Sequence, residues 1–263
     1  MPRANRHYIP GYVWHITHRC HKQEFLLRFA RDKRRWIAWL FEARKRYGLS
    51  ILSYIVTSNH IHLLVSDNGD NESIPKSMQL LAGRTGQQYN QRKGRTGAFW
   101  EDRYHATAVE RDEHLMQCMV YIALNMVRAG VVRHPDQWPY SSYHEIQTPR
   151  NRYRLIDYEH LMALFGIRDL KELQEAYSER IQEACRQQSN GRENKWTESI
   201  AVGSKVFVED TKEKLGMKAH GREIIGRDGT YQLREASKPY GYHFDHKNDD
   251  LRLENGYFWD DIS

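Results

Sequence analysis

The sequence has few cysteines and no long apolar run. Its three cysteines, Cys20, Cys118 and Cys185, are odd in number and far apart in 263 residues, which argues against a disulfide framework or a zinc knuckle and favours reduced thiols. No stretch approaches the roughly 20 apolar residues that a membrane span needs. Residues 1–6 are not followed by the apolar core of a signal peptide. We therefore expect a cytoplasmic protein with no membrane partner.

The charge of the chain is uneven. The formal net charge is +6, but residues 1–150 carry 22 Lys and Arg against 13 Asp and Glu, a balance of +9. Residues 151–263 carry 18 against 21, a balance of −3. A positive field on one part of a protein is typical of polyanion binding, although an ordinary solvated basic surface has the same composition. Charge alone leaves both interpretations open.

The stretch from Ser58 to Val65 predicts a buried strand with two histidines on one face. It is apolar and β-branched, and it follows another strand-like run from Ile51 to Val56. Side chains two residues apart in a strand lie on one face, so His60 and His62 should project together. Two neutral imidazoles at this spacing supply half of a divalent-metal site. The alternative is a pair of core histidines with no ligand.

A predicted helix places a phenol and an amide one turn apart. Asp112 is a candidate N-cap, and an apolar run follows it as far as Asn125. Tyr121 and Asn125 are four residues apart and therefore share one helical face. The amide oxygen could join the two histidines as a third metal ligand, with the phenol beside the metal as a nucleophile. The alternative for Tyr121 is a packed helix tyrosine, which would be favoured if the histidines were absent.

The order of the predicted elements indicates an α+β fold. Strands are expected at residues 12–20, 49–56, 59–66 and 104–110, and helices at 31–47 and 73–92, ahead of the tyrosine helix at 112–125. This order is that of the split βαβ, ferredoxin-like sheet. Two helices then cover one face of the sheet, and the other face is left for the histidines and the tyrosine helix.

The pattern changes near residue 148. Beyond it, helices are expected at 155–166, 169–188 and 206–215, a short strand at 229–234 and a linker at 189–195, while 245–263 shows no clear period. We therefore expect a catalytic domain at residues 1–148 and a mainly helical C-terminal region at 149–263.

Several motifs between about residues 8 and 145 resemble those of a known family. His60-Ile61-His62 is similar to the His-hydrophobic-His motif of the HUH endonucleases, and YIALNMVRAG at 121–130 resembles the Tyr-Ile-x-x-Asn-Pro-Val-Arg-Ala-Gly signature of single-tyrosine transposases. Shorter similarities are GYVWHIT at 11–17, GRTG at 94–97 and FWEDRY at 99–104. The closer match is to the REP-associated tyrosine transposases, relatives of insertion-sequence transposases. Met126 stands where the family has proline, so the helix need not break there.

The resemblance implies a metal-dependent single-strand DNA endonuclease and strand transferase. Tyr121 would attack hairpin-bearing, REP-like DNA and form a 5′-phosphotyrosyl intermediate, with Mg²⁺ or Mn²⁺ held by His60, His62 and Asn125. The same resemblance implies a ferredoxin-like fold and favours a monomer, with the homodimer of insertion-sequence relatives as the alternative. The C-terminal region would then grip a DNA hairpin or serve only as a packing appendage.

Five residues are candidates for contact with DNA. Arg95 and Arg103 are candidate phosphate contacts, and Tyr104 lies in a strand beside Arg103. Trp100 could stack on unpaired bases, although a core role fits it equally well. Arg128 is either a phosphate contact or a cation at the C-terminus of a helix.

Two other functions fit the same residues. One is a DNA-binding regulator whose catalytic site is a relic, and the other is a metal-dependent nuclease that uses water as the nucleophile. Only the transferase forms a covalent protein–DNA adduct. The nuclease cleaves DNA without an adduct, and the regulator binds DNA without cleaving it.

Overall fold

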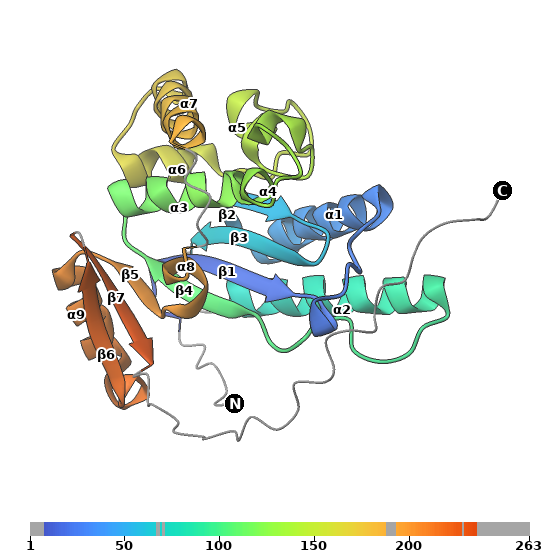
Figure 1. Cartoon of the computed structure of the whole chain (residues 1–263), viewed down its shortest axis with the longest axis horizontal. Helices are drawn as coiled ribbons and strands as arrows, with labels where there is room; N and C mark the ends of the chain where they lie inside the picture. The colour runs from blue at the N-terminus through green and yellow to red at the C-terminus, as the bar shows by residue number, and fades with distance from the viewer. Residues whose placement is uncertain (1–7, 67–68, 70–71, 188–192, 228, 236–263) are drawn as a thin grey trace, which may run out of the picture.

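The computed structural model describes residues 8–66, 69, 72–187, 193–227 and 229–235. In the first part of the chain a sheet lies between two layers of helices (Figure 1). Its strands are β1 (Val13–Arg19), β2 (Ser50–Val56), β3 (His60–Ser66) and β4 (His105–Val109), and its helices are α1 (Ala30–Tyr47), α2 (Ser73–Lys93), α3 (Glu113–Ala123) and α4 (Asn125–Arg128).

The four strands lie in the order β2-β3-β1-β4, and every neighbouring pair is antiparallel. Helix α1 connects β1 to β2, and α2 connects β3 to β4. This is the ferredoxin-like arrangement, and the predicted α+β fold class is confirmed. The predicted bounds of these four strands and two helices agree with the structure to within one residue at each end.

Helices α1 and α2 pack against each other and cover one face of the sheet (Figure 1). Helix α1 ends at Gly48, whose φ of 63° is the left-handed conformation that commonly ends a helix. Trp36, Leu40 and Ala43 lie at helical spacing on α1 and are buried. Trp39 is half-buried, and its Nε1 donates to Oε1 of Gln88 on α2 at 3.0 Å.

Helix α3 lies on the other side of the sheet, with α6 (Tyr158–Phe165) and α7 (Leu170–Arg186) beyond it (Figure 1). Leu173, Tyr177 and Ile181 of α7 are fully buried, and the phenol of Tyr177 donates to the Met119 carbonyl of α3 at 3.5 Å. Helix α3 stops at Ala123, and Leu124 separates it from α4. The helix is therefore interrupted one residue before Asn125, although position 126 lacks the proline of the family signature.

The C-terminal region also extends the sheet. Strand β5 (Ala201–Gly203) pairs with β4 in parallel, and β7 (Thr230–Glu235) and β6 (Arg222–Arg227) follow, which gives a seven-stranded order of β2-β3-β1-β4-β5-β7-β6. The sequence predicted β7 and the helix α9 (Lys205–Leu215) but not β5, which is too short to show alternation, or β6, which is mostly exposed. The remaining elements are α5 (Tyr143–Gln147), α8 (Lys195–Glu198) and 3₁₀ turns at His21–Gln23, Pro135–Gln137 and Gly216–Ala219.

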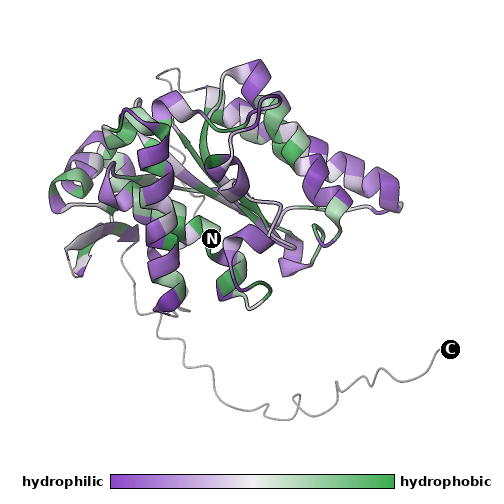
Figure 2. Ribbon diagram, turned by 90° about the horizontal axis from the view of Figure 1, so that it is seen from above, coloured by the Kyte–Doolittle hydropathy of each residue, from purple (hydrophilic) through white to green (hydrophobic). Residues whose placement is uncertain are grey.

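The core follows the sheet. Figure 2 shows apolar strands at the centre and helices whose outer surfaces are largely hydrophilic. Among the described residues, no helix combines the length and apolar character needed to cross a membrane. Most of the expected linker at 189–195, and all of 245–263, lie outside the described residues.

Candidate catalytic site

Two histidines at the start of β3 project into one cavity. His60 is half-buried and His62 is 2% exposed. Their ring centroids are 5.0 Å apart, and the ring planes are nearly perpendicular. Ile61 between them is fully buried, as expected for the opposite face of a strand.

His62 is held by a chain of hydrogen bonds that begins in the C-terminal region. Its Nδ1 is 2.9 Å from Nε2 of His15 on β1, and Nδ1 of His15 is 3.0 Å from the carbonyl oxygen of Trp196 on α8. His15 is completely buried, and this burial lowers its pKa to about 3. The imidazole of His15 is therefore neutral at pH 7.

His60 is held locally. Its Nδ1 is 2.7 Å from Oδ1 of Asn59 and 3.0 Å from Oγ1 of Thr57. The backbone N–H of His60 also donates to the Thr57 hydroxyl at 3.0 Å. Because the amide oxygen of Asn59 can only accept, Nδ1 of His60 carries the hydrogen in this arrangement.

Asn125 contacts the same histidine from the helical side. Its Nδ2 is 2.9 Å from Nε2 of His62. A ring nitrogen that accepts from an amide N–H carries a lone pair and no hydrogen. A half-turn of the amide would exchange its nitrogen for its oxygen at the same place, so His62 and Asn125 can face one ligand together.

Tyr121 lies beside this group and is 4% exposed. Its ring centroid is 5.7 Å from that of His62 and 6.1 Å from that of His15, edge to face in both cases. The guanidinium carbon of Arg128 lies 4.0 Å from the centre of the phenol ring, and Nη2 of Arg128 donates to the Tyr121 carbonyl oxygen at 2.7 Å. Burial lowers the pKa of Arg128 from its ordinary value. The phenol thus has imidazoles on one side and a cation on another.

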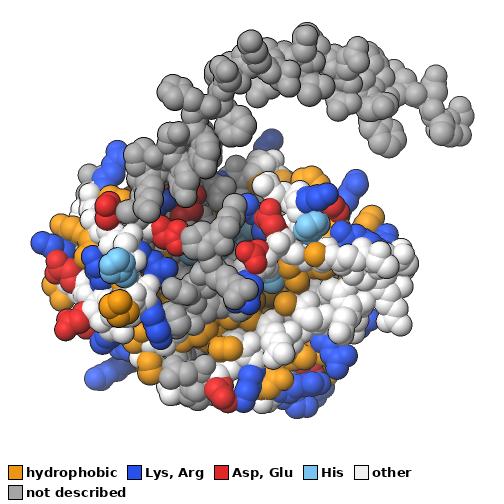
Figure 3. Space-filling view, turned by 90° about the horizontal axis from the view of Figure 1, so that it is seen from below, with side chains coloured by type: hydrophobic (Ala, Val, Ile, Leu, Met, Phe, Trp, Pro, Cys, Tyr) orange, Lys and Arg blue, Asp and Glu red, His pale blue; other side chains and the backbone are white. Residues whose placement is uncertain are grey.

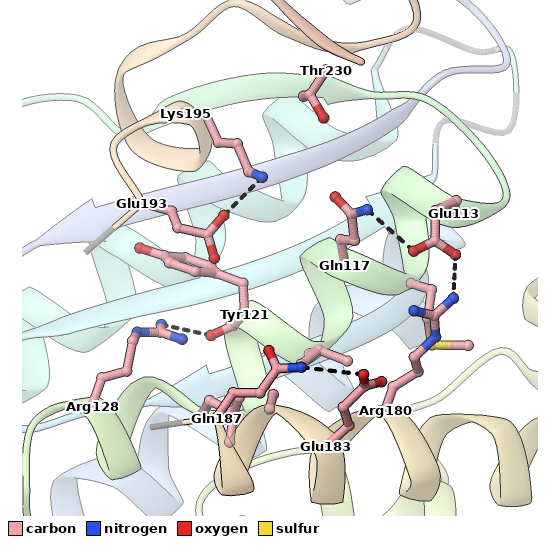
Figure 4. Close-up of a pocket in the computed structure, with 14 residues that line it drawn as sticks. Glu113, Gln117, Tyr121, Arg128, Arg180, Glu183, Gln187, Glu193, Lys195 and Thr230 are labelled. Carbon is pink, nitrogen blue, oxygen red and sulfur yellow. Dashed lines mark hydrogen bonds and ion pairs between the residues drawn. The ribbon is translucent and has the colours of Figure 1, made fainter. Parts of the chain in front are cut away.

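A cavity of about 750 Å³ lies in front of these side chains. His60, His62, Tyr121 and Asn125 all line it. A second cavity of about 400 Å³ lies behind Tyr121 and is walled by α3, α7 and the segment before α8. Tyr121 and Arg128 line both cavities, and in Figure 4 the Tyr121 ring lies between Arg128 and Glu193. The other residues around the larger cavity are mostly polar: Thr17, His18, Arg19, Gln23, Asn59, Glu101, Asp102, Arg103, His105, Arg128, Ala129 and Thr197.

The predicted arginines take different positions. Arg103 and Arg128 are on the wall of the larger cavity, and Arg103 is exposed. Arg95 is not among the residues that line it. The Nη1 of Arg95 donates to the Ala98 carbonyl at 3.0 Å, and Nη2 lies 3.8 Å from the Glu24 carboxylate. Only two of the three arginines are therefore close to the histidines.

The two aromatic candidates are packed against protein. The Trp100 ring stacks on His18 at a centroid distance of 4.0 Å, and its Nε1 donates to the Ala82 carbonyl at 3.1 Å. Tyr104 is 4% exposed, and its hydroxyl accepts from the Tyr8 hydroxyl at 3.0 Å. These contacts match the packing role that the sequence left open for Trp100.

The charge on the cavity wall is mixed. Lys and Arg side chains on the face drawn in Figure 3 are interspersed with acidic ones and form no single field. Within the cavity, Glu101 and Asp102 accompany the arginines, and Arg19 lies 3.9 Å from the Glu101 carboxylate. The residues that line the cavity include three arginines and two carboxylates, so the positive balance of residues 1–150 is not concentrated on this wall.

Sequence reasoning did not assign the residues behind the histidines. His15 and Thr17 share a strand face, and Thr17 pairs directly with His62 across β1 and β3. The sequence shows that these two residues share a face. It does not predict the contact between His15 and the Trp196 carbonyl, because no local pattern connects residue 196 to a strand 181 residues earlier.

Comparison with known proteins relates part of the chain to transposases. The pattern that defines the IS200-like transposases matches residues 10–125. A protein of Haemophilus influenzae that carries the name REP-associated tyrosine transposase is 29% identical over 110 residues, which are 38% of this chain and 62% of that protein. The chain thus spans about three fifths of the length of this relative.

Two solved structures are also similar to the chain. One is a REP-associated tyrosine transposase bound to a REP hairpin, with 19% identity and a TM-score of 0.49 over 57% of this chain and 87% of that one. The other is a crystal structure from Deinococcus radiodurans assigned as a transposase, with 14% identity and a TM-score of 0.33 over 48% and 95%. At these scores the fold assignment rests on the chain's own strand order. The similarity to the IS200-like transposases covers residues 10–125, the part of the chain that holds strands β1 to β4 and Tyr121.

Proposed function

We propose that the protein is a metal-dependent single-strand DNA endonuclease and strand transferase with Tyr121 as its nucleophile. The observation that carries this proposal is the distance of 5.7 Å between the rings of Tyr121 and His62, on the wall of a cavity that His60 and Asn125 also line. A phenol from α3, two imidazoles from β3 and an amide from α4 meet at one place. A packed tyrosine alone would not require this set.

The donor atoms fit a divalent cation. His60, His62 and Asn125 offer two ring nitrogens and an amide oxygen, a set that suits Mn²⁺ and is acceptable to Mg²⁺. Each histidine has its Nδ1 hydrogen bonded to another group, as metal-ligating histidines usually do. Such an ion, when bound, would polarise the scissile phosphate.

The residues of the chain account for the transfer. The Tyr121 oxygen attacks phosphorus, the new O–P bond forms, and the bond from phosphorus to the 3′ oxygen breaks. The phenol proton passes to solvent, and the departing 3′ oxygen takes up a proton to give a free 3′-OH. The downstream strand stays on Tyr121 as a 5′-phosphotyrosyl ester, whose energy permits rejoining without ATP. The Arg128 guanidinium, 4.0 Å from the phenol ring, favours negative charge on the tyrosine oxygen.

The proposed substrate is single-stranded DNA that carries a REP-like hairpin. The support is the similarity of residues 10–125 to the IS200-like transposases, the REP association in the name of the Haemophilus influenzae relative, and the positive balance of residues 1–150. A single chain holds the whole donor set, which supports a monomer with its tyrosine helix acting on its own sheet. We propose that residues 1–148 are the catalytic domain and that the region from 149 onward contributes to hairpin binding.

The test is adduct formation by wild-type protein and by the Tyr121→Phe variant. Phenylalanine keeps the ring, its packing and the carbonyl that Arg128 contacts, and it removes only the hydroxyl. A strand with a hairpin and a 3′ label is mixed with protein and Mn²⁺, and the sample is denatured. The label should migrate with wild-type protein and not with Tyr121→Phe, while binding of uncleaved DNA stays within about twofold.

Three results would overturn the proposal. An adduct that persists in Tyr121→Phe would assign the nucleophile to another residue. Cleavage without an adduct by both proteins would support water as the nucleophile. Binding without cleavage by wild-type protein, with either Mn²⁺ or Mg²⁺, would favour a regulator with a relic site.

A further inference from the structure

We propose that His15 is a positioning residue which, with the Trp196 carbonyl, fixes His62 as the Nδ1–H tautomer and directs its Nε2 lone pair at the cavity. This inference rests on the proposed function only in naming the group that the lone pair would meet. It assigns a role in the site to β1 and to the C-terminal region.

The first step follows from the chemistry of a carbonyl. The Trp196 oxygen can only accept, and it is 3.0 Å from Nδ1 of His15, so that nitrogen must carry a hydrogen. Both ring nitrogens of His15 are then accounted for, one by Trp196 and the other by His62. A charged imidazole at this fully buried position would have no carboxylate on either nitrogen, so the neutral form is the stable one.

The tautomer of His15 determines the tautomer of His62. A neutral His15 with a hydrogen on Nδ1 has a lone pair on Nε2, which must accept. The group 2.9 Å away is Nδ1 of His62, which must therefore donate. His62 is left with its lone pair on Nε2, and the amide of Asn125 at 2.9 Å is a donor that matches it.

The Trp196 carbonyl, where this series of hydrogen bonds begins, is itself held in place by other residues. Trp196 is completely buried, its Nε1 donates to the Glu193 carboxylate at 3.2 Å, and its backbone N–H donates to the Glu193 carbonyl at 3.2 Å. The Thr107 hydroxyl of β4 donates to the Ser199 carbonyl at 2.6 Å and lies 3.3 Å from the Trp196 carbonyl oxygen, so it packs beside this carbonyl. The carbonyl therefore has a fixed direction, and the tautomer of His62 depends on contacts that reach across the sheet.

The tautomer decides whether His62 can bind a metal through Nε2. In water the Nε2–H tautomer of histidine is the more abundant one, and in that form Nε2 has no lone pair to offer. Loss of the group that orients a ligating histidine typically costs about 10- to 100-fold in metal affinity. We expect a loss of this size when His15 can no longer accept from His62.

The direct test is nitrogen NMR of metal-free protein with ¹⁵N-labelled histidine. Correlation of the ring nitrogens with the carbon-bound ring protons distinguishes the two tautomers, and the His62 signals are assigned by their absence in His62→Gln. The wild-type protein should show His62 with a protonated Nδ1 and an unprotonated Nε2. A wild-type His62 with the hydrogen on Nε2 would overturn the proposal without any variant.

Variants of His15 test the dependence. In His15→Leu, which removes the acceptor, His62 should shift toward the Nε2–H tautomer, and Mn²⁺ affinity measured by electron paramagnetic resonance should fall about 10- to 100-fold. His15→Gln provides an amide oxygen that can accept, and it should recover most of that loss. His114→Leu changes a half-buried histidine outside both cavities, and it should leave Mn²⁺ affinity unchanged.

Binding of uncleaved DNA without metal should be the same in all four proteins, which separates positioning from general damage to the fold. If His15→Leu does not fold, the proposal is still tested by the Mn²⁺ affinity of His15→Gln and by the tautomer of His62 in the wild-type spectrum. Unaltered Mn²⁺ affinity in a folded His15→Leu would overturn the proposal, as would a His15→Gln that binds no better than His15→Leu. These results are independent of adduct formation, so failure of the proposed function is seen separately.

Discussion

His60 and His62 are two residues apart on one strand, yet the chain supports them in different ways. Nδ1 of His60 contacts Asn59 and Thr57, its neighbours in the turn before β3. Nδ1 of His62 contacts His15, 47 residues away, which in turn contacts a carbonyl 181 residues further along the chain. One support is local, and the other exists only when β1, β3 and the C-terminal region are together.

The difference shows where the site depends on the whole fold. A turn of four residues can form its hydrogen bonds early and keep them when distant parts of the protein loosen. The support of His62 is lost if either β1 or α8 shifts by about 1 Å, because a hydrogen bond weakens steeply beyond its normal length. His62 therefore links the C-terminal region to the chemistry that we propose for Tyr121.

The largest expected effect comes from removing each histidine in turn. Both His60→Ala and His62→Ala should lose the covalent adduct, because each removes a proposed ligand. Their stabilities should differ. His62→Ala leaves a cavity and an unpartnered His15 nitrogen in the core, which should cost about 2–4 kcal/mol in the free energy of unfolding. His60 is half-buried, and its removal should cost about 1 kcal/mol or less.

Urea unfolding of the metal-free variants measures this difference. His62→Gln is the matched control, because it restores polar atoms at a similar reach and should recover part of the stability without the adduct. Equal losses of stability for the two alanine variants would contradict the distinction between local and long-range support.

The fold was largely predictable because its main strands and helices are long enough to show in the sequence. The apolar, β-branched run from Ser58 to Val65 identified β3, and the expected order of strands and helices was that of the ferredoxin-like sheet. Strand β5 has only three residues, and its place in the sheet comes from pairing with β4. A segment this short carries no period, so its role could only come from tertiary structure.

The candidate site was predictable to the extent that its spacing is local. His60 and His62 are two apart, and Tyr121 and Asn125 are four apart, so each pair is brought together by one short stretch of chain. Nothing in the sequence connected His15 to Trp196. That contact needs the segment after α7 to return across β1, and such a path depends on packing and not on the pattern of neighbouring residues.

A substitution at Asn59 weakens the local support of His60 alone. Asn59→Ala removes an acceptor from Nδ1 of His60 but leaves the Thr57 hydroxyl, so Mn²⁺ affinity should fall by about tenfold, the lower end of the range for an orienting group. The free energy of unfolding should change by about 0.5 kcal/mol or less, because the side chain is partly exposed.

Asn59→Asp is the matched control for this change. It keeps an oxygen that accepts from Nδ1 of His60, so its Mn²⁺ affinity should remain close to that of the wild type. Titration of all three proteins with Mn²⁺ gives the comparison. If Asn59→Ala destabilised the protein as much as His62→Ala, the support of His60 would not be local.

The smallest expected effect is on the salt dependence of DNA binding, measured for Arg103 and Arg95. Like the two histidines, these two arginines differ in their surroundings. Arg103 is exposed on the wall of the cavity with the histidines, whereas Arg95 is tied to the Ala98 carbonyl outside it. If a single strand crosses the cavity, Arg103→Gln should remove one phosphate contact and make the log–log salt dependence of binding shallower by about 0.7. Arg95→Gln should leave the slope unchanged. Fluorescence anisotropy with a labelled hairpin strand, from about 50 to 200 mM salt, measures both slopes, and a perfect duplex of the same length serves as the competitor.

Arg128 is unsuitable for this comparison because it contacts the Tyr121 carbonyl, so its loss would disturb the tyrosine itself. Equal slopes for the two variants would mean that the strand does not pass Arg103. A shallower salt dependence for Arg95→Gln alone would indicate that the DNA passes the end of α2 and not the cavity.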